Sequence, residues 1–185
     1  MTSNALDSLA QAVQKMEDSS HPPVHLWNPE HCGDIDIVIK HDGTWLHEGR
    51  VLKRERLVRL FSTVLWLEGS QHYLKTPAEK LSITVETTPF LITQMEVENE
   101  GSAEQKILLT TSYGDTVVIG SEHTIHLDKN MIAEQEVPLV AVRYGMMGRI
   151  NRSVYERLVE LGEIVETAQG YQLQLISDGV MFELS

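Results

Sequence analysis

The stretch GDIDIVIKHDGTWL, residues 33–46, alternates apolar and polar side chains and then turns. Its isoleucines are spaced two apart, so they fall on one face of a strand, because successive side chains of a strand point to opposite faces. Asp42 and Gly43 form a turn dipeptide, and residues 44–46 supply a returning strand. The stretch therefore predicts an antiparallel hairpin with one buried face.

Helical and strand-like patterns occupy separate segments of this 185-residue chain. Apolar residues three and four apart predict helices over residues 4–17, 53–68 and 151–161. Between residues 81 and 142, short strand-like runs are separated by turn residues. We predict an α+β fold of two small domains, each with a mostly antiparallel sheet and one main helix, plus an N-terminal helix.

Turn and linker residues divide the chain into these parts. Pro22 and Pro23 follow the first helical pattern and cannot continue a helix. We predict three segments: an N-terminal helix and linker over residues 1–21, an α+β domain over residues 22–80, and a β-rich α+β domain over residues 81–185. Residues 76–79, Thr-Pro-Ala-Glu, have the form of a helix capping box.

An internal repeat relates the two domains. Without a gap, residues 45–75 superimpose on residues 143–173 at an offset of 98 with six identities. In each segment a strand and a glycine-containing turn precede a helix opened by basic residues, and a strand containing a tyrosine follows. We therefore expect one strand-helix-strand motif in each domain.

The arginines are confined to these two segments. The chain has eight of them: Arg50, Arg54, Arg56, Arg59, Arg143, Arg149, Arg152 and Arg157. Cations near a helix N-terminus oppose the helix dipole, at roughly a few tenths of a kcal/mol each, unless an anion binds there. We therefore expect Arg54 and Arg152 to contact a small anion, with Lys53, Arg149 and Asn151 in support. Ion pairs with the acidic residues are the competing explanation.

The charge and the cysteine content exclude several classes of protein. A net charge of −12 argues against a broad basic surface for nucleic acid and against attraction to anionic membranes. The single cysteine, Cys32, excludes an internal disulfide and a multi-cysteine metal cage. Without a secretory leader or a long apolar run, the sequence predicts a cytoplasmic protein. Neither a zinc-site spacing nor a glycine-rich phosphate loop occurs, so we expect no metal and no cofactor.

Two further groups of residues are candidates for chemistry. Asp34 and Asp36 share a strand face and are suited to general acid/base work or a divalent cation, although the pair also reads as the solvated side of the strand. Cys32 follows His31, as a thiolate nucleophile beside a base would. A small buried residue next to a glycine turn explains Cys32 equally well.

Several short motifs occur together in register. They are PVHLWNPEHCGDID at residues 23–36, DGTW at 42–45, LVRLF at 57–61, TPAEK at 76–80, PF at 89–90 and INRSVY at 150–155. Over residues 22–184 the chain resembles the proteobacterial domain-of-unknown-function family 1285, with departures at Ala78 and Thr87. The resemblance implies a two-domain α+β protein with repeated motifs and a small-molecule-binding or signalling role. The positions that match the family motifs are candidate ligand contacts: Cys32, Asp34, Asp36, Trp45, Arg54, Glu79, Lys80, Asn151 and Arg152.

These observations favour a regulatory or signalling module that binds a small anionic ligand between its two domains, and they favour this role over an enzyme. One alternative is a metal-assisted or thiol hydrolase that uses Asp34 and Asp36, or Cys32. Another is a protein-interaction module, for example a homodimer. It would assemble through the apolar side of the N-terminal helix, formed by Leu6, Leu9, Val13 and Met16.

Overall fold

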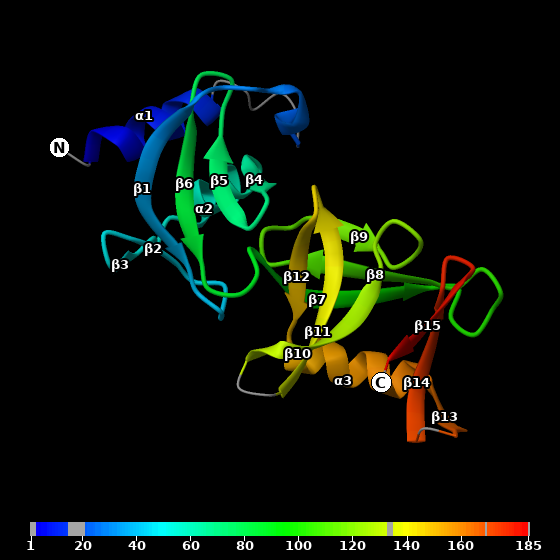
Figure 1. Ribbon diagram of the computed structural model, residues 1–185. Coiled ribbons are helices and arrows are strands. Elements are labelled where there is room, and N and C mark those ends of the chain that lie inside the picture. Colours follow the sequence, from blue (N-terminus) through cyan, green and yellow to red (C-terminus); the bar gives the residue numbers. More distant parts are fainter. Residues whose placement is uncertain (1–2, 15–20, 133–134, 169, 185) are drawn as a thin grey trace. The chain divides into compact units, whose positions relative to one another are not determined.

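The computed structural model describes residues 3–14, 21–132, 135–168 and 170–184. The chain forms two compact units, Met1–Thr87 and Thr88–Ser185, each described here by itself (Figure 1). The predicted α+β class with two domains is confirmed. The division lies between Thr87 and Thr88 instead of between residues 80 and 81, because the strand that starts at Lys80 pairs within the first unit.

The first unit is built on a six-stranded sheet with the order β3-β2-β1-β6-β5-β4. Its strands are β1 (His31–Ile39), β2 (Trp45–His47), β3 (Arg50–Val51), β4 (Leu65–Glu68), β5 (Gln71–Lys75) and β6 (Lys80–Val85). Only β1 and β6 run parallel to one another. The predicted hairpin is β1-β2: the Thr44 amide donates to Asp42 Oδ1 at 2.9 Å, and Gly43 takes a φ of 84° in the turn.

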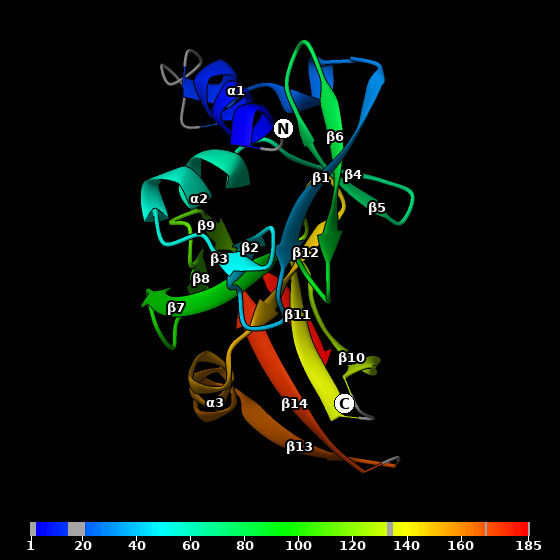
Figure 2. The same ribbon diagram turned by 90° about the vertical axis from the view of Figure 1, so that its left-hand side faces the viewer.

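Two α-helices of the first unit, α1 (Ser3–Gln14) and α2 (Glu55–Ser62), contact each other beside the sheet (Figure 2). A short 3-10 helix, η1 (Val24–Leu26), leads into β1. The end of the expected first helix, residues 15–17, lies outside the described residues. The helix expected over residues 53–68 is wrong in its second half, because residues 65–68 form β4, where Leu65 pairs with Leu74.

The core of the first unit lies between the sheet and the helices. Trp45 is 2% exposed and stacks on Phe61 of α2, with ring centroids 6.4 Å apart. Leu9 and Val13 of α1 are buried as well. The isoleucines of β1 point to this side, as their alternation predicts.

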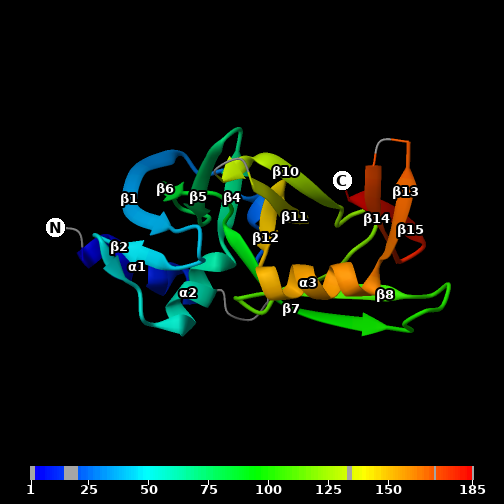
Figure 3. The ribbon, with the colours of Figure 1, turned by 90° about the horizontal axis from the view of Figure 1, so that it is seen from below.

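The second unit contains two sheets. A six-stranded sheet has the order β10-β11-β12-β7-β8-β9, and a three-stranded sheet has the order β13-β14-β15. The strands are β7 (Phe90–Glu98), β8 (Lys106–Thr111), β9 (Thr116–Val118), β10 (Ile125–Ile132), β11 (Gln135–Arg143), β12 (Met146–Ile150), β13 (Glu163–Thr167), β14 (Gly170–Ser177) and β15 (Val180–Leu184). The helix α3 (Arg152–Leu161) lies along β7 (Figure 3).

The expected repeat is present as a series of elements. In the first unit β3, α2, β4 and β5 follow one another, and in the second unit β12, α3, β13 and β14 do so at the predicted offset. The strand-helix-strand prediction is confirmed. The surroundings of the hairpins differ, because β5 pairs with β6 in the main sheet while β14 pairs with β15 in a separate one.

Two local predictions at helix ends have different outcomes. Asn151 caps α3, since its side chain accepts a hydrogen bond from the Val154 amide at 2.8 Å. The capping box at Thr76 does not begin a helix. Instead, Thr76 Oγ1 accepts bonds from the amides of Ala78 and Glu79 in the turn between β5 and β6. The same local bonds that open a helix also close a turn.

Gly162, which ends α3, is required for space and not for a left-handed backbone, since its φ is −82°. A Cβ there would lie 2.6 Å from Leu173 Cδ1 and 2.8 Å from the Gln174 carbonyl oxygen. We expect Gly162→Ala to destabilise the second unit by about 1–3 kcal/mol, because a backbone atom has to move. Urea unfolding followed by circular dichroism measures this change. Glu163→Ala, at the exposed neighbouring position, is the control, and equal stabilities of the two variants would contradict the prediction.

Candidate functional site

The face of the first sheet that points away from its isoleucines carries polar and aromatic side chains. Asp34 of β1, Ser82 of β6 and Tyr73 of β5 are register partners across the three strands, so they share this face. Two residues further along, Lys75 of β5 pairs with Lys80 of β6 on the same face. Residues from strands that are distant in sequence therefore meet on one surface.

Lys75 is the unusual residue on this face. It is only 3% exposed, and its ammonium nitrogen lies 4.0 Å from the centroid of the Trp66 ring. In the described part of the chain, no carboxylate comes within 4.0 Å of that nitrogen. A buried cation that faces an aromatic ring is attracted by the ring but lacks a counter-ion.

Lys80, the pairing partner of Lys75, makes an ion pair and also contacts an aromatic ring. Its Nζ lies 2.7 Å from Glu68 Oε2 and 4.9 Å from the centroid of the Tyr73 ring. The other carboxylate oxygen of Glu68 accepts a bond from Trp66 Nε1 at 3.0 Å. These contacts join Trp66, Glu68, Tyr73, Lys75 and Lys80 into one group, which we call the Lys75 cluster.

The protonation of the Lys75 cluster follows from its charges and its burial. Burial lowers the pKa of Lys75, and the charge of Lys80 lowers it further, against the opposing effect of Glu68. The hydrogen bond from Lys80 holds the pKa of Glu68 below its ordinary value. Glu68 is therefore a carboxylate, and Lys75 is the amine that loses its proton more readily than an ordinary lysine.

A groove of about 680 Å³ is lined by residues of β1, β5 and β6, and none of the five cluster residues is among its lining residues. Among its lining residues are Asp34, Asp36, Gln71 and Ser82. Ser82 Oγ donates to Asp34, whose carboxylate also lies 3.8 Å from His31 Nε2. The His31 ring meets the Tyr73 ring edge-on at 5.7 Å between centroids, which connects the groove to the Lys75 cluster.

Some candidates from the sequence lie at this site. Asp34, Asp36 and Lys80 are on the face just described, and Glu79 precedes Lys80 in the turn. Trp45 lies in the core on the opposite face of the sheet, where it is 2% exposed and stacks on Phe61. The side chain of Cys32 lies outside the described part of the structure.

The cations at the start of α2 have a separate environment. Lys53 and Arg54 are exposed, and Arg54 makes no side-chain bond that caps the helix. Arg54 lines a second groove, of about 540 Å³, between α1 and α2, together with Arg56 and the acidic residues Asp7 and Glu55. The charges along this groove are therefore mixed.

The remaining candidates belong to the second unit. Arg152 pairs with Glu156, with its Nε 2.8 Å from Oε1, and 91% of its side chain is exposed. Arg149 is half-buried on β12, and the side chain of Asn151 is used as a cap. The competing explanation by local ion pairs holds for Arg152. Neither unit by itself brings Arg54 and Arg152 together.

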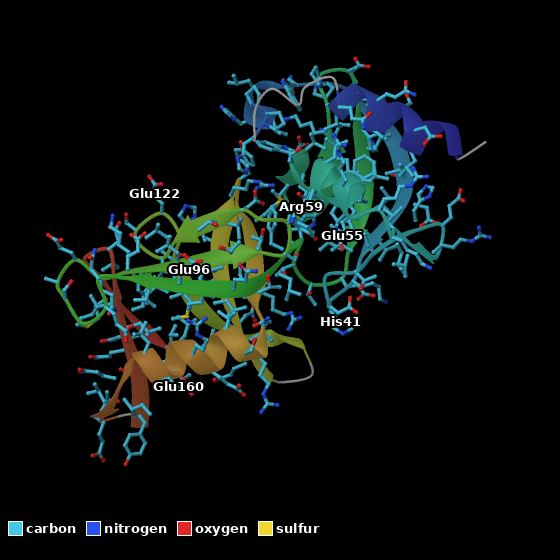
Figure 4. The ribbon with its side chains drawn as sticks, turned by 180° about the vertical axis from the view of Figure 1, so that it is seen from behind. His41, Glu55, Arg59, Glu96, Glu122 and Glu160 are labelled. Carbon is cyan, nitrogen blue, oxygen red and sulfur yellow. The ribbon has the colours of Figure 1, made fainter. Side chains whose placement is uncertain are left out.

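The charged side chains of the helices and of the sheet edges are mostly solvated. Figure 4 labels several of them, including Glu55 and Arg59 of α2, which lie in its first and last turns and so match the helix dipole. His41, also labelled, follows β1 and bonds to Glu86. The helix dipole and the contacts with Glu86 account for these three charged or titratable residues.

Sequence reasoning missed Lys75, Trp66, Glu68 and Tyr73. A usable pattern was present, because Trp66 and Glu68 alternate on one short run while Tyr73 and Lys75 alternate on the next. Reading residues 65–68 as helix hid this alternation. The pairing of the two runs with each other became visible only in the β4-β5 register.

Two further findings concern metals and membranes. In residues 3–14, 21–132, 135–168 and 170–184, no three His, Cys, Asp or Glu side chains gather closely enough to hold a metal ion. Among the helices within those ranges, none has the length and apolar character needed to cross a membrane.

Comparisons with known proteins agree with the motifs read from the sequence. Residues 22–88 match the N-terminal domain of DUF1285, a domain of unknown function, and residues 89–184 match its C-terminal domain. No curated protein matches the chain.

Two solved structures are similar to this chain. One is a DUF1285 family protein from Silicibacter pomeroyi DSS-3, with 37% identity, a TM-score of 0.85, and coverage of 95% of this chain and 93% of that one. The other, from Shewanella baltica OS155, is 24% identical with a TM-score of 0.52, and covers 69% of this chain and 92% of that one, which shows a shared fold. Since both family models match in order and the Silicibacter protein is similar along nearly its whole length, the chain belongs to the DUF1285 family.

Proposed function

We propose that the protein is a regulatory module whose first unit binds a small organic anion at the Lys75 cluster. A carboxylate or phosphate group of the ligand contacts the ammonium group of Lys75, and the rest of the ligand extends along the groove that ends at Asp34. The ligand is a small anion, as expected from the sequence. Its proposed site is on the first sheet and not at the N-termini of α2 and α3.

One observation carries the proposal, namely the burial of Lys75 without a carboxylate partner. Transfer of a cation from water into a protein costs free energy unless it is paired. Lys80, one strand away, has the pairing that Lys75 lacks, through Glu68 at 2.7 Å. An anionic ligand at Lys75 completes the same arrangement and adds a charge-assisted hydrogen bond.

The environment of the aspartates favours binding over hydrolysis. The side chain of Asp34 is 85% exposed, and Asp36 is exposed too. General acid/base catalysis places its carboxylates in a site shielded from water, which these solvated positions do not offer. Their placement fits contacts to polar groups of a ligand in the groove.

The environment of α1 argues against assembly through its apolar side. Leu9 and Val13 are buried within their own unit, where α1 packs on α2. Met16, the last of the four apolar residues, lies outside the described residues. A helix face that is already covered offers little apolar area to a second subunit.

A ligand screen tests the proposed site. We expect at least one compound among small carboxylates, phosphates and nucleotides to raise the melting temperature of the native protein. Lys75→Met removes the charge and keeps a long side chain, so the affinity for that compound should fall by about tenfold or more, because a charge-assisted hydrogen bond is lost. Isothermal titration calorimetry measures the affinity.

Two control variants locate the effect. Lys106→Met removes one positive charge from the second unit, where Lys106 pairs with Asp178, and should leave the affinity unchanged. Arg54→Met removes the cation expected from the sequence and should also leave it unchanged. A loss of binding in Arg54→Met with none in Lys75→Met would place the anion at α2 and refute the proposal, as would a screen without any stabilising anion.

A further inference from the structure

The difference between the two paired lysines suggests a covalent role for one of them. We infer that Lys75 is a carbonyl-reactive amine that forms a reversible imine with a small oxo acid held at the Lys75 cluster. The inference rests on the proposed function, since the acid group of the ligand takes the anion position described above. It goes further by naming the ligand class and the bond formed.

Geometry distinguishes Lys75 from its neighbour. Lys80 Nζ lies 2.7 Å from a carboxylate oxygen of Glu68, and 14% of its side chain is exposed. Lys75 Nζ lies 4.0 Å from the centroid of the Trp66 ring, and the residue is 3% exposed. A desolvated lysine next to a second cation is the environment that makes an amine nucleophilic in proteins. Burial lowers the pKa of Lys75, and the charge of Lys80 lowers it further, while the charge of Glu68 opposes both.

The position of Lys75 also limits the size of the carbonyl compound. Lys75 Nζ lies 4.0 Å from the centroid of the Trp66 ring and the residue is only 3% exposed, so little of the side chain is open to a large reagent. We therefore choose the smallest oxo acid, glyoxylate, as the probe, because its carboxylate is bonded directly to the reacting carbon and so stays beside the Lys75 amine. A bulky aromatic aldehyde such as pyridoxal is the comparison, because a residue that is 3% exposed is less accessible to a large reagent.

The chemical step is balanced without any oxidant. The lone pair of the neutral Lys75 amine attacks the carbonyl carbon, and the π electrons move to the oxygen. A proton passes from nitrogen to that oxygen to give a carbinolamine. Loss of the hydroxyl group with one more proton, as water, leaves the imine. Addition of water reverses the sequence and releases the ligand, as a sensor of a metabolite requires.

Reductive trapping tests the inference on the native full-length protein. Glyoxylate and cyanoborohydride convert an imine into a stable carboxymethyl-lysine, which peptide mass mapping assigns to one of the seven lysines. We expect Lys75 to carry most of the adduct at low conversion, and pyridoxal to label Lys75 no faster than the exposed lysines. In urea-unfolded protein the preference for Lys75 should disappear. Equal labelling of all lysines in the folded protein would overturn the inference.

A second measurement separates this inference from the proposed function. Glycolate has the carboxylate but no carbonyl group, so it reports binding alone. Glycolate binding that depends on Lys75, combined with glyoxylate labelling spread over all lysines, would overturn the imine and leave the anion site standing. Preferential labelling of Lys75, abolished in Lys75→Arg and kept in Lys106→Arg, supports the imine whether or not glycolate binds. Because the mapping is made on the native chain, the conclusion does not depend on the folding of a variant.

Discussion

Replacing Arg143 by methionine is expected to destabilise the second unit by about 3 kcal/mol. Arg143 Nη1 lies 2.8 Å from Asp115 Oδ2, and only 12% and 14% of the two side chains are exposed. The guanidinium also lies 4.8 Å from the centroid of the Phe90 ring. Methionine fills a similar volume but leaves the Asp115 carboxylate in a largely water-free place without the guanidinium, and the desolvation of that charge is then uncompensated.

A second variant shows whether the charge is the cause. In Arg143→Met combined with Asp115→Asn, the buried charge is absent, so most of the lost stability should return. Circular dichroism during urea unfolding reports both units. All three tryptophans, Trp27, Trp45 and Trp66, belong to the first unit, so tryptophan fluorescence follows the unfolding of that unit separately. A double variant as unstable as the single one would show that this ion pair is not what the second unit depends on.

Replacing Trp45 by alanine should destabilise the first unit by about 3–5 kcal/mol. Trp45 is 2% exposed and stacks on Phe61, so its removal leaves a large cavity between the sheet and α2. A loss of that size is a large part of the stability of a small domain. The transition followed by the remaining tryptophans should move to lower urea concentration, while the second unit keeps its own transition.

Trp66 provides a matched comparison within the same unit. It is half-buried on the other face of the sheet, over Lys75, so Trp66→Ala should cost less stability than Trp45→Ala and should reduce anion binding more at a temperature where both variants are folded. The two tryptophans are therefore expected to separate stability from ligand binding. A folded Trp45→Ala variant that unfolds like the native protein but binds no anion would contradict the placement of Trp45 in the core.

The sequence by itself was enough for the class of fold and for the elements with a clear period. The alternation in β1, the Asp42-Gly43 turn and the Asn151 cap are local features, and local geometry alone defines them. The offset of 98 between the repeated segments was readable for the same reason, because each copy keeps its own order of strand, helix and strand.

Where local patterns compete, the sequence was misleading. Leu65 to Glu68 continue the helical spacing of α2, yet they form β4 because β5 offers a pairing partner with a buried Leu74. Thr76 has the bonds of a helix cap but closes a turn, because the chain continues into β6, which pairs with β5. In each case a neighbour distant from the local window determines the outcome.

The candidate site shows the same division most clearly. The alternation of polar and apolar residues in β1 placed Asp34 and Asp36 on one face, and the motif at residues 76–80 included Lys80. Part of this face of the first sheet was therefore predictable from the sequence. Only the tertiary structure identified Lys75. Three observations distinguish this residue: it is buried, its Nζ lies over the Trp66 ring, and the nearby Glu68 forms its ion pair with Lys80 instead. Burial and the pairing of charges are relations between strands, and no spacing along a single chain segment records them.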